Sequence, residues 1–487
     1  MKIQNRNRKQ LKSRLESAES YSEWHAAAEA LDEMDGLLAW REDDSTQLLH
    51  ESLIRDHISR MKRLREQCEM RKLIRVLQES LYRHLGELSN PELYAFARTG
   101  TKYLAGEFLR EVETSMQFIC DNPIPDVPES RKLELFQEAE HVYGQPALML
   151  SGGAAFGVYH VGVTRALWNE DLLPRVIAGS SMGAIVAGMI CSRNDSDLEE
   201  FFQHPQRAHR EAFRWRNPGQ AFRDGYMMDQ DQLHEHIQAN IGSVSFQEAF
   251  ERSGRELNIS ISPTRTQQKP RLLNRMASPG VLVDYAVLAS CAVPGLYPPV
   301  MLRARDPEPG SHDDTSYMPS ERWIDGSIHG DLPLMRMARL HNVNKTIVSQ
   351  ANPHVVPFIS HHHHRGTAVS LKRAVQSVAH GQLATTLNLT RNWSSPVFRP
   401  LMEQAYAMTT QTYLGDINIH FPFRPTLYRK VLSNPSAEDL EMYIRMGERA
   451  TWPRIAMIRD QTRISHAFKE CIEKLKKRAE KEQTQEK

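Results

Sequence analysis

The chain has 487 residues, 40% of them hydrophobic, and its 61 basic and 60 acidic side chains leave a net charge of +1. This length predicts about three domains with buried cores. The near-zero charge, with no repeats, heptads or nucleic-acid motifs, argues against a nucleic-acid-binding protein. Five cysteines are scattered without C-x-x-C spacing, which predicts reduced, mostly buried thiols.

A basic segment, residues 1–14, opens the chain with six cations before the first acidic residue, Glu16. Six cations near an anionic lipid surface contribute about 1 kcal/mol each, enough for reversible attachment. The same composition is typical of a solvated tail, so both interpretations stay open. The polar start and the lack of a long apolar run predict a cytosolic protein without signal peptide or transmembrane helix.

Residues 15–140 are predicted to form a helical N-terminal domain. Apolar residues recur there at helical spacing in two stripes, and such stripes are core faces far more often than binding surfaces. One stripe is Ile54, Ile58, Met61 and Leu64, and the other is Ile74, Leu77, Leu81, Leu85 and Leu88.

An α/β domain is predicted over residues 145–355, where short apolar runs alternate with helical patterns. This alternation is typical of a mostly parallel sheet with helices on both faces. Strands are predicted at 147–150, 176–178, 257–261, 323–324 and 346–348. The polar segment 301–320 is predicted either to flank a cleft or to form a surface insertion.

Residues 356–487 are predicted to be mainly helical. Phe468, Ile472 and Leu475 share one helix face among lysines. That face either lies on a membrane surface or packs on the domain, and the second interpretation is favoured. The run His361–His364 has no carboxylate or cysteine at ligand spacing, so we expect no metal site there.

The segment Gly179–Gly183 joins a short apolar run to a longer one and places Ser181 at the centre. It fits the G-x-S-x-G nucleophile elbow, in which Gly179 and Gly183 remove side chains that would collide where a strand turns into a helix. A plain Gly/Ser loop between buried elements explains these five residues equally well. Ser180 is interpreted as structural, because the glycine frame centres on its neighbour.

A glycine-rich turn, residues 151–157, follows the predicted strand 147–150 and precedes a helical pattern. Backbone N–H groups at such a turn can hydrogen-bond an oxyanion, and one donor is worth about 3 to 4 kcal/mol in acyl transfer. A nucleotide phosphate loop is disfavoured, because the glycine spacing is wrong and no lysine follows.

The third segment, Trp323–Ser327, delivers Asp325 from a short apolar strand into an Asp-Gly turn. Such a pair alone marks only a β-turn. In the order glycine-rich turn, serine elbow and Asp-Gly turn, however, the chain resembles the patatin-like phospholipases. The resemblance implies a Ser/Asp dyad with Ser181 as nucleophile and Asp325 as base, without metal or cofactor. It also implies an oxyanion hole lined by Gly152, Gly153 and Ala154.

Further segments resemble one subgroup, the triacylglycerol lipases of yeast lipid droplets and the plant sugar-dependent lipase. These segments are 289–295, 325–327, 347–354 and 415–419, together with Tyr21, Trp24, Leu31, Asp32 and residues 100–102 in the helical region. The resemblance covers most of residues 15–425 and implies a patatin-like core with helical regions before and after it.

Two features bear on how such a site would work. Ala154 stands where patatins usually have a third glycine, and neither 155 nor 156 is basic. The alanine N–H still donates, but a positive φ at 154 would be costly. An ordinary aspartate, with a pKa near 4, is a weak base, so we expect burial to raise the pKa of Asp325.

A histidine triad is the competing catalytic arrangement, because His329 follows Asp325 by four residues and the order Ser, Asp, His suits an α/β-hydrolase. With 21 histidines in the chain, a surface or structural role is favoured for His329. His160 is interpreted as a helix-packing residue.

We expect a serine acyl hydrolase that cleaves fatty-acyl esters of triacylglycerol or glycerophospholipid through an acyl-enzyme, while reversibly attached to a membrane or lipid droplet. One alternative is a lysophospholipid acyltransferase, against which the absence of an H-x-x-x-x-D signature counts. The other is a non-catalytic lipid-surface scaffold, against which the intact Ser181 and Asp325 count.

Overall fold

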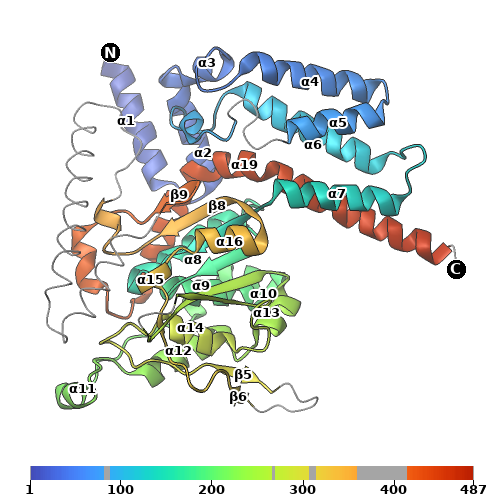
Figure 1. Cartoon of the computed structure of the whole chain (residues 1–487). Helices are drawn as coiled ribbons and strands as arrows, with labels where there is room; N and C mark the ends of the chain where they lie inside the picture. The colour runs from blue at the N-terminus through green and yellow to red at the C-terminus, as the bar shows by residue number, and fades with distance from the viewer. Residues whose placement is uncertain (1, 82–87, 266–268, 307–313, 359–413, 486–487) are drawn as a thin grey trace, which may run out of the picture. The chain divides into compact units, whose positions relative to one another are not determined.

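The computed structural model describes residues 2–81, 88–265, 269–306, 314–358 and 414–485 (Figure 1). The chain forms two compact units. The helical unit comprises Met1–Pro146, Ala338–Lys345 and Trp452–Lys487, and the sheet unit comprises Ala147–Met337 and Thr346–Thr451. His361–His364 lie outside the described residues.

The helical unit is built from amphipathic helices. They are α1 (Lys2–Ser17), α2 (Tyr21–Met34), α3 (Leu37–Glu42), α4 (Glu51–Glu66), α5 (Met70–Ser80), α6 (Tyr103–Asp121), α7 (Glu129–Tyr143) and the second part of α19 (Ala437–Gln485). The basic segment is therefore helical rather than a disordered tail. The stripe predicted on α4 is buried.

The second predicted stripe is only partly correct. Helix α5 ends at Ser80, and its buried face carries Leu73 and Val76 beside Leu77, whereas Ile74 is only half-buried. Leu85 lies outside the described residues. The stripe Phe468, Ile472, Leu475 on α19 is buried within the helical unit, so packing on the domain is confirmed for this face and the membrane-surface interpretation is wrong.

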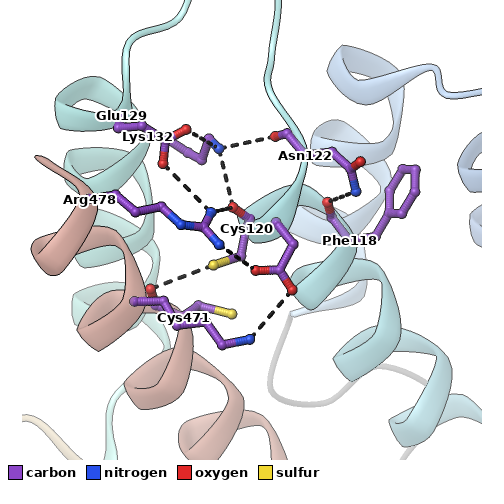
Figure 2. Close-up of polar contacts among 9 residues, drawn as sticks. Phe118, Cys120, Asn122, Glu129, Lys132, Cys471 and Arg478 are labelled. Atoms are coloured by element: carbon purple, nitrogen blue, oxygen red, sulfur yellow. Dashed lines mark hydrogen bonds and ion pairs between the residues drawn. The ribbon is translucent and has the colours of Figure 1, made fainter. Parts of the chain in front are cut away.

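The C-terminal end of α6 is held by two cations from neighbouring helices (Figure 2). The carbonyl of Cys120 accepts hydrogen bonds from Lys132 Nζ at 3.2 Å and from Arg478 at 2.8 Å. Lys132 Nζ also donates to the carbonyl of Asn122 and to Glu129. The last carbonyls of a helix lack partners within the helix and carry partial negative charge, so these cations both satisfy and stabilise the end of α6.

The sheet unit is organised on a mixed sheet with the order β4-β3-β2-β1-β8-β9. Its strands are β1 (Gln145–Leu150), β2 (Val176–Gly179), β3 (Glu256–Pro263), β4 (Arg271–Asn274), β7 (Trp323–Asp325), β8 (Val343–Gln350) and β9 (Ile417–His420). The pairs β1–β2, β2–β3 and β8–β9 are parallel, whereas β4 and β7 run antiparallel to β3. All five predicted strands form, and β4 and β9 are additional.

Helices and a short hairpin complete the sheet unit. They are α8 (Tyr159–Trp168), α9 (Met182–Cys191), α10 (Asp195–Gln203), α11 (Pro218–Asp224), α12 (Gln230–Ile241), α13 (Phe246–Ser253), α14 (Val283–Ser290), α15 (Ser327–Gly330), the first part of α16 (Leu334–His341), and the pair β5 (Arg303–Arg305) and β6 (Asp314–Ser316). Every residue of α9 is buried, which makes it the central helix of the unit. The hairpin lies in the polar segment predicted at 301–320.

Two features are missing from the described part of the chain. None of its helices combines the length and the apolar character needed to cross a bilayer. No group of three or more histidine, cysteine or acidic side chains within the described ranges is arranged to hold a metal ion.

Candidate active site

The strand register brings Ser181 and Asp325 to the same place. Gly179 at the end of β2 pairs with Ile259 of β3, so Ser181, two residues further on, is level with Ile261. Ile261 pairs with Asp325 at the end of β7. Because β4 occupies the other edge of β3 at Ile261, β7 must lie on the edge that β2 uses. The two strands therefore approach end to end along β3, with Ser181 and Asp325 between them.

Ser181 has a backbone conformation that few non-glycine residues adopt, with φ of 51° and ψ of −124°. Such strain costs on the order of 1–3 kcal/mol and is typical of functional sites. A Cβ on Gly179 would lie 2.3 Å from the carbonyl oxygen of Gly183, and one on Gly183 would lie 2.3 Å from the carbonyl oxygen of Leu150. The glycine frame of the elbow is thus a steric requirement.

Asp325 is completely buried beside the elbow. Its N–H donates to the carbonyl of Ala292 at 3.0 Å, and its Oδ1 accepts from the N–H of Ser327 at 2.7 Å. Burial raises the pKa of Asp325 to about 6, although hydrogen bonds from Ser327 and from the Ser181 hydroxyl oppose this shift. The expected rise in pKa is confirmed. Oδ2 has no partner of good hydrogen-bond geometry among the described residues, so it is the oxygen left to accept a proton.

Residues at the end of α14 support this pair. The N–H of Ser181 donates to Ser290 Oγ at 2.9 Å, and the Ser290 hydroxyl donates to the carbonyl of Ser260 at 2.7 Å. The Cys291 thiol is close to both members of the pair, and burial together with the charge of Asp325 raises its pKa well above the usual value. Cys291 therefore stays protonated and is a poor nucleophile.

The glycine-rich turn lies against the elbow. A Cβ on Gly152 would be 3.4 Å from Ser181 Cβ. The N–H of Gly152 is already engaged, since it donates to Asp331 Oδ1 at 2.8 Å. Within the described ranges, the N–H groups of Gly153, Ala154 and Met182 have no hydrogen-bond acceptor. These three N–H groups are the donors left for an oxyanion. Met182 directly follows Ser181, and in hydrolase elbows the N–H of the residue after the nucleophile forms part of the oxyanion hole.

Ala154 adopts a φ of 45°. The structure therefore has the positive φ that the sequence analysis described as costly for an alanine. A left-handed conformation costs a residue with a side chain roughly 1–2 kcal/mol. The strained residue lies in the turn that would bind an oxyanion, and strained backbone conformations are common at functional sites.

Asp331 is a buried carboxylate that the sequence analysis missed. Its Oδ1 accepts the hydrogen bond from the Gly152 N–H, and its Oδ2 accepts one from Asn352 Nδ2 at 2.5 Å. Burial and the charge of Asp325 raise the pKa of Asp331 to about 7, while hydrogen bonds from Gly152, Ser180 and Asn352 oppose this shift. A second titratable carboxyl group is therefore coupled to the first.

The remaining candidates have structural or undescribed roles. His160 is buried, with Nδ1 2.7 Å from Ser349 Oγ and Nε2 2.9 Å from the carbonyl of Ser151. Burial lowers the pKa of His160 to about 4, so it is neutral and joins the ends of β1 and β8. Ser180 is buried beside Asp331, which agrees with a structural role. The side chain of His329 lies outside the described residues.

The residues that were missed differ in how visible they are in the sequence. Ser290, Cys291 and Asn352 lie in the segments 289–295 and 347–354, which carried the family resemblance, but nothing in their spacing gave them a role. Asp331 lay outside those segments. Only the contact between the turn after β1 and the chain after α15 gives it a role.

Comparison with known proteins identifies the family of the chain. Residues 148–338 match the family model of patatin-like phospholipases, and residues 1–141 match a domain of unknown function, DUF3336. Triacylglycerol lipase ptl3 of Schizosaccharomyces pombe is 32% identical over 483 residues, which cover 97% of this chain and 99% of that protein. The chain belongs to the patatin-like phospholipase family.

Other relatives are longer than this chain. Triacylglycerol lipase 4 of Saccharomyces cerevisiae is 30% identical, and the match covers 96% of this chain but 53% of the yeast protein. Triacylglycerol lipase SDP1L of Arabidopsis thaliana is 32% identical, with 96% and 58% covered. The chain thus spans only slightly more than half the length of these two patatin-like relatives.

Proposed function

We propose that the protein is a serine acyl hydrolase that cleaves fatty-acyl esters through a Ser181/Asp325 dyad. The observation that carries the proposal is the buried Asp325 beside a strained Ser181. The pKa of Asp325 is raised to about 6, and its Oδ2 has no partner of good hydrogen-bond geometry among the described residues. A base with a pKa near neutrality is both ionised at working pH and able to hold a proton.

In the first half-reaction, Ser181 Oγ attacks the ester carbonyl and its proton passes to Asp325 Oδ2. The carbonyl oxygen becomes an oxyanion that accepts hydrogen bonds from Gly153, Ala154 and Met182. When the carbonyl re-forms, the alcohol leaves with the proton held by Asp325, and the acyl group remains on Ser181. Water then attacks this ester with Asp325 as base, releasing the fatty acid.

The three relatives described above are all named triacylglycerol lipases, which supports a fatty-acyl ester of glycerol as substrate. We propose triacylglycerol or glycerophospholipid as substrate, reached while the protein is peripherally attached to a membrane or a lipid droplet. The mechanism asks for no metal or cofactor.

The test is release of fatty acid from triolein emulsions and phosphatidylcholine vesicles. Ser181→Ala and Asp325→Asn are each expected to lower the rate by roughly four orders of magnitude or more, since dyad members act as a unit. Ser192→Ala is the matched control, because Ser192 is a buried serine at the other end of α9. If the intact protein binds these lipids but releases no more fatty acid than the two variants, the scaffold interpretation replaces this proposal.

A further inference from the structure

The segment between α10 and α12, residues 204–228, exposes several large apolar side chains to solvent. Phe222 is 94% exposed, Trp215 56% and Met227 52%. Single exposed apolar residues are normal on soluble proteins, but a cluster containing an almost fully exposed phenylalanine marks an interaction surface.

Residues 204–228 form an ordered loop that projects from the sheet unit, and this loop is called the excursion below. Trp215 and Met228 form an antiparallel bridge at its base, and Arg216 N–H donates to the Met227 carbonyl at 3.0 Å. Helix α11 lies at the tip, where Gly225 ends it with a φ of 77°. Figure 1 shows α11 standing apart from the other labelled helices of the sheet unit. Phe222 lies on this helix and is therefore exposed on an ordered support.

The charge of the segment is strongly biased. Residues 204–228 contain five arginines, no lysine and two acidic residues. In the described part of the chain, no acidic side chain pairs with Arg210 or Arg223. Arg223 is exposed and Arg210 is half-buried. Guanidinium groups bind phosphate in bidentate fashion. Exposed aromatic residues beside arginines are the composition found where proteins meet the headgroup layer of a membrane.

The excursion is tied to the candidate active site. Met228 N–H donates to the Leu296 carbonyl at 2.9 Å, in the loop that begins at Ala292, whose carbonyl holds Asp325. On the other side, Phe213 and Met182, the neighbour of Ser181, line the same small apolar cavity of about 50 Å³. The base of the excursion, at Phe213 and Met228, is therefore connected to the chain that holds Asp325 and to the residue that follows Ser181.

We propose that residues 210–228 are the surface by which the sheet unit docks on a lipid layer with anionic phospholipid headgroups. Phe222 and Trp215 enter the acyl region, while Arg210 and Arg223 bind phosphates. The inference rests on the proposed function, because the ester substrate lies in such a layer. A lipid layer fits better than a protein partner, since α11 is only about 10 Å long and a stable protein interface buries roughly 1,000 Å² or more.

The test is flotation of the full chain with phosphatidylcholine vesicles, with and without phosphatidylserine, in a Ser181→Ala background that prevents hydrolysis. Combined Phe222→Ser and Trp215→Ser is expected to weaken binding to both vesicles about tenfold or more. Combined Arg210→Gln and Arg223→Gln is expected to weaken binding to phosphatidylserine vesicles about tenfold. The loss on phosphatidylcholine vesicles should be smaller, because phosphatidylcholine has a phosphate but no net charge. Met276→Ser, at an exposed methionine elsewhere in the sheet unit, is the control and should bind normally.

Equal binding of the parent and both combined variants would overturn the docking proposal. Hydrolysis of soluble p-nitrophenyl butyrate, measured with Ser181 intact, separates this outcome from failure of the proposed function. The docking variants should retain that hydrolysis, which also shows that they fold. If the intact protein does not hydrolyse the ester but the variants still lose vesicle binding, the proposed function fails while the docking surface stands.

Discussion

The burial of Asp325 sets the pH range in which the proposed reaction can run. The base must be ionised, and its pKa is raised to about 6. We therefore expect kcat/KM for a soluble ester to rise with pH up to about 6 and to level off above it. A pH profile of p-nitrophenyl butyrate hydrolysis checks this. An acid limb near pH 4, the ordinary value for an aspartate, would show that burial does not tune this carboxyl group.

Asp331 gives a second prediction that depends on pH. Its pKa is about 7 in the folded protein against 3.8 ordinarily, so between these values the folded state binds more protons than the unfolded state. Stability from the protonated carboxyl is thus present at low pH and is lost as pH rises through about 7. Asp331→Asn cannot ionise, so relative to the parent it should gain on the order of 4 kcal/mol between pH 4 and pH 8.

Urea unfolding of the Asp331→Asn variant and the parent at several pH values measures this difference. Any hydrogen bond that the asparagine changes contributes a constant offset. Titrating groups that do not interact with Asp331 cancel between the two proteins, whereas Asp325, which is coupled to Asp331, does not cancel fully. A difference that does not vary with pH would mean that Asp331 ionises as freely in the folded protein as in the unfolded chain.

The elbow could be predicted because it is local: two glycines, one serine and the apolar runs beside them lie within one strand–turn–helix. The partners of Asp331 could not. Gly152 and Asn352 lie far from it along the chain, and neither hydrophobic period nor motif spacing encodes a contact between a turn and a distant loop. For Ala154 the sequence stated the alternatives, but the sign of φ depended on how the turn packs.

At the scale of the helices, the contribution of the α6 cap to the free energy of unfolding can be measured. Lys132 is 1% exposed and donates to two carbonyls and to Glu129. Lys132→Met removes the cation from the half-buried Asn122 and Glu129 and leaves Arg478 as the donor to the Cys120 carbonyl, so we expect a loss of about 2–3 kcal/mol in the free energy of unfolding.

Lys474→Met is the matched control for Lys132→Met. Lys474 belongs to the same network, because Asp121 pairs with both Lys474 and Arg478, but Lys474 is 46% exposed and lies 3.4 Å from Asp121. A pair this exposed contributes about 0.5 kcal/mol or less. Thermal unfolding should therefore separate the two variants by several degrees, and equal shifts would mean that burial does not strengthen the cap.

The strands and helices show where the hydrophobic pattern of the sequence predicts secondary structure correctly and where it does not. Buried runs such as Ala147–Leu150 predicted their strands because all four side chains are apolar and enclosed. Strand β9 was missed because it ends the sheet order and its four residues alternate between buried and half-buried, which is too short a pattern to recognise. On α5, apolar residues occur on more than one face, so the register of the buried stripe was ambiguous.

At the scale of the whole chain, the sheet unit is closed by segments far apart in sequence. Phe421, just after β9, stacks on Phe156 with ring centroids 4.6 Å apart, and Tyr443 of α19 packs on both. The sheet thus continues past residue 355, where the sequence suggested a boundary. Phe156 follows Ala154 in the glycine-rich turn, so the late part of the unit supports the candidate oxyanion hole.

Gly447 tests this closure directly, because α19 and α8 touch there through their backbones. A Cβ on Gly447 would lie 2.2 Å from the carbonyl oxygen of Tyr159, whereas one on Gly219 of α11 would meet nothing within 4 Å. Gly447→Ala should therefore cost about 1–3 kcal/mol through overpacking. Gly219→Ala should be neutral or gain up to about 1 kcal/mol from reduced chain entropy.

Urea unfolding and soluble-ester hydrolysis, measured on Gly447→Ala and Gly219→Ala, give two independent readouts of the same contact. Because α8 begins directly after the turn that holds Ala154, displacement of α8 by the Gly447 clash should also lower ester hydrolysis, while Gly219→Ala keeps it. Loss of stability without loss of hydrolysis would mean that the closure supports the fold but not the turn. Unchanged stability would mean that α8 and α19 separate enough to admit a methyl group at no cost, and that the close approach is not needed.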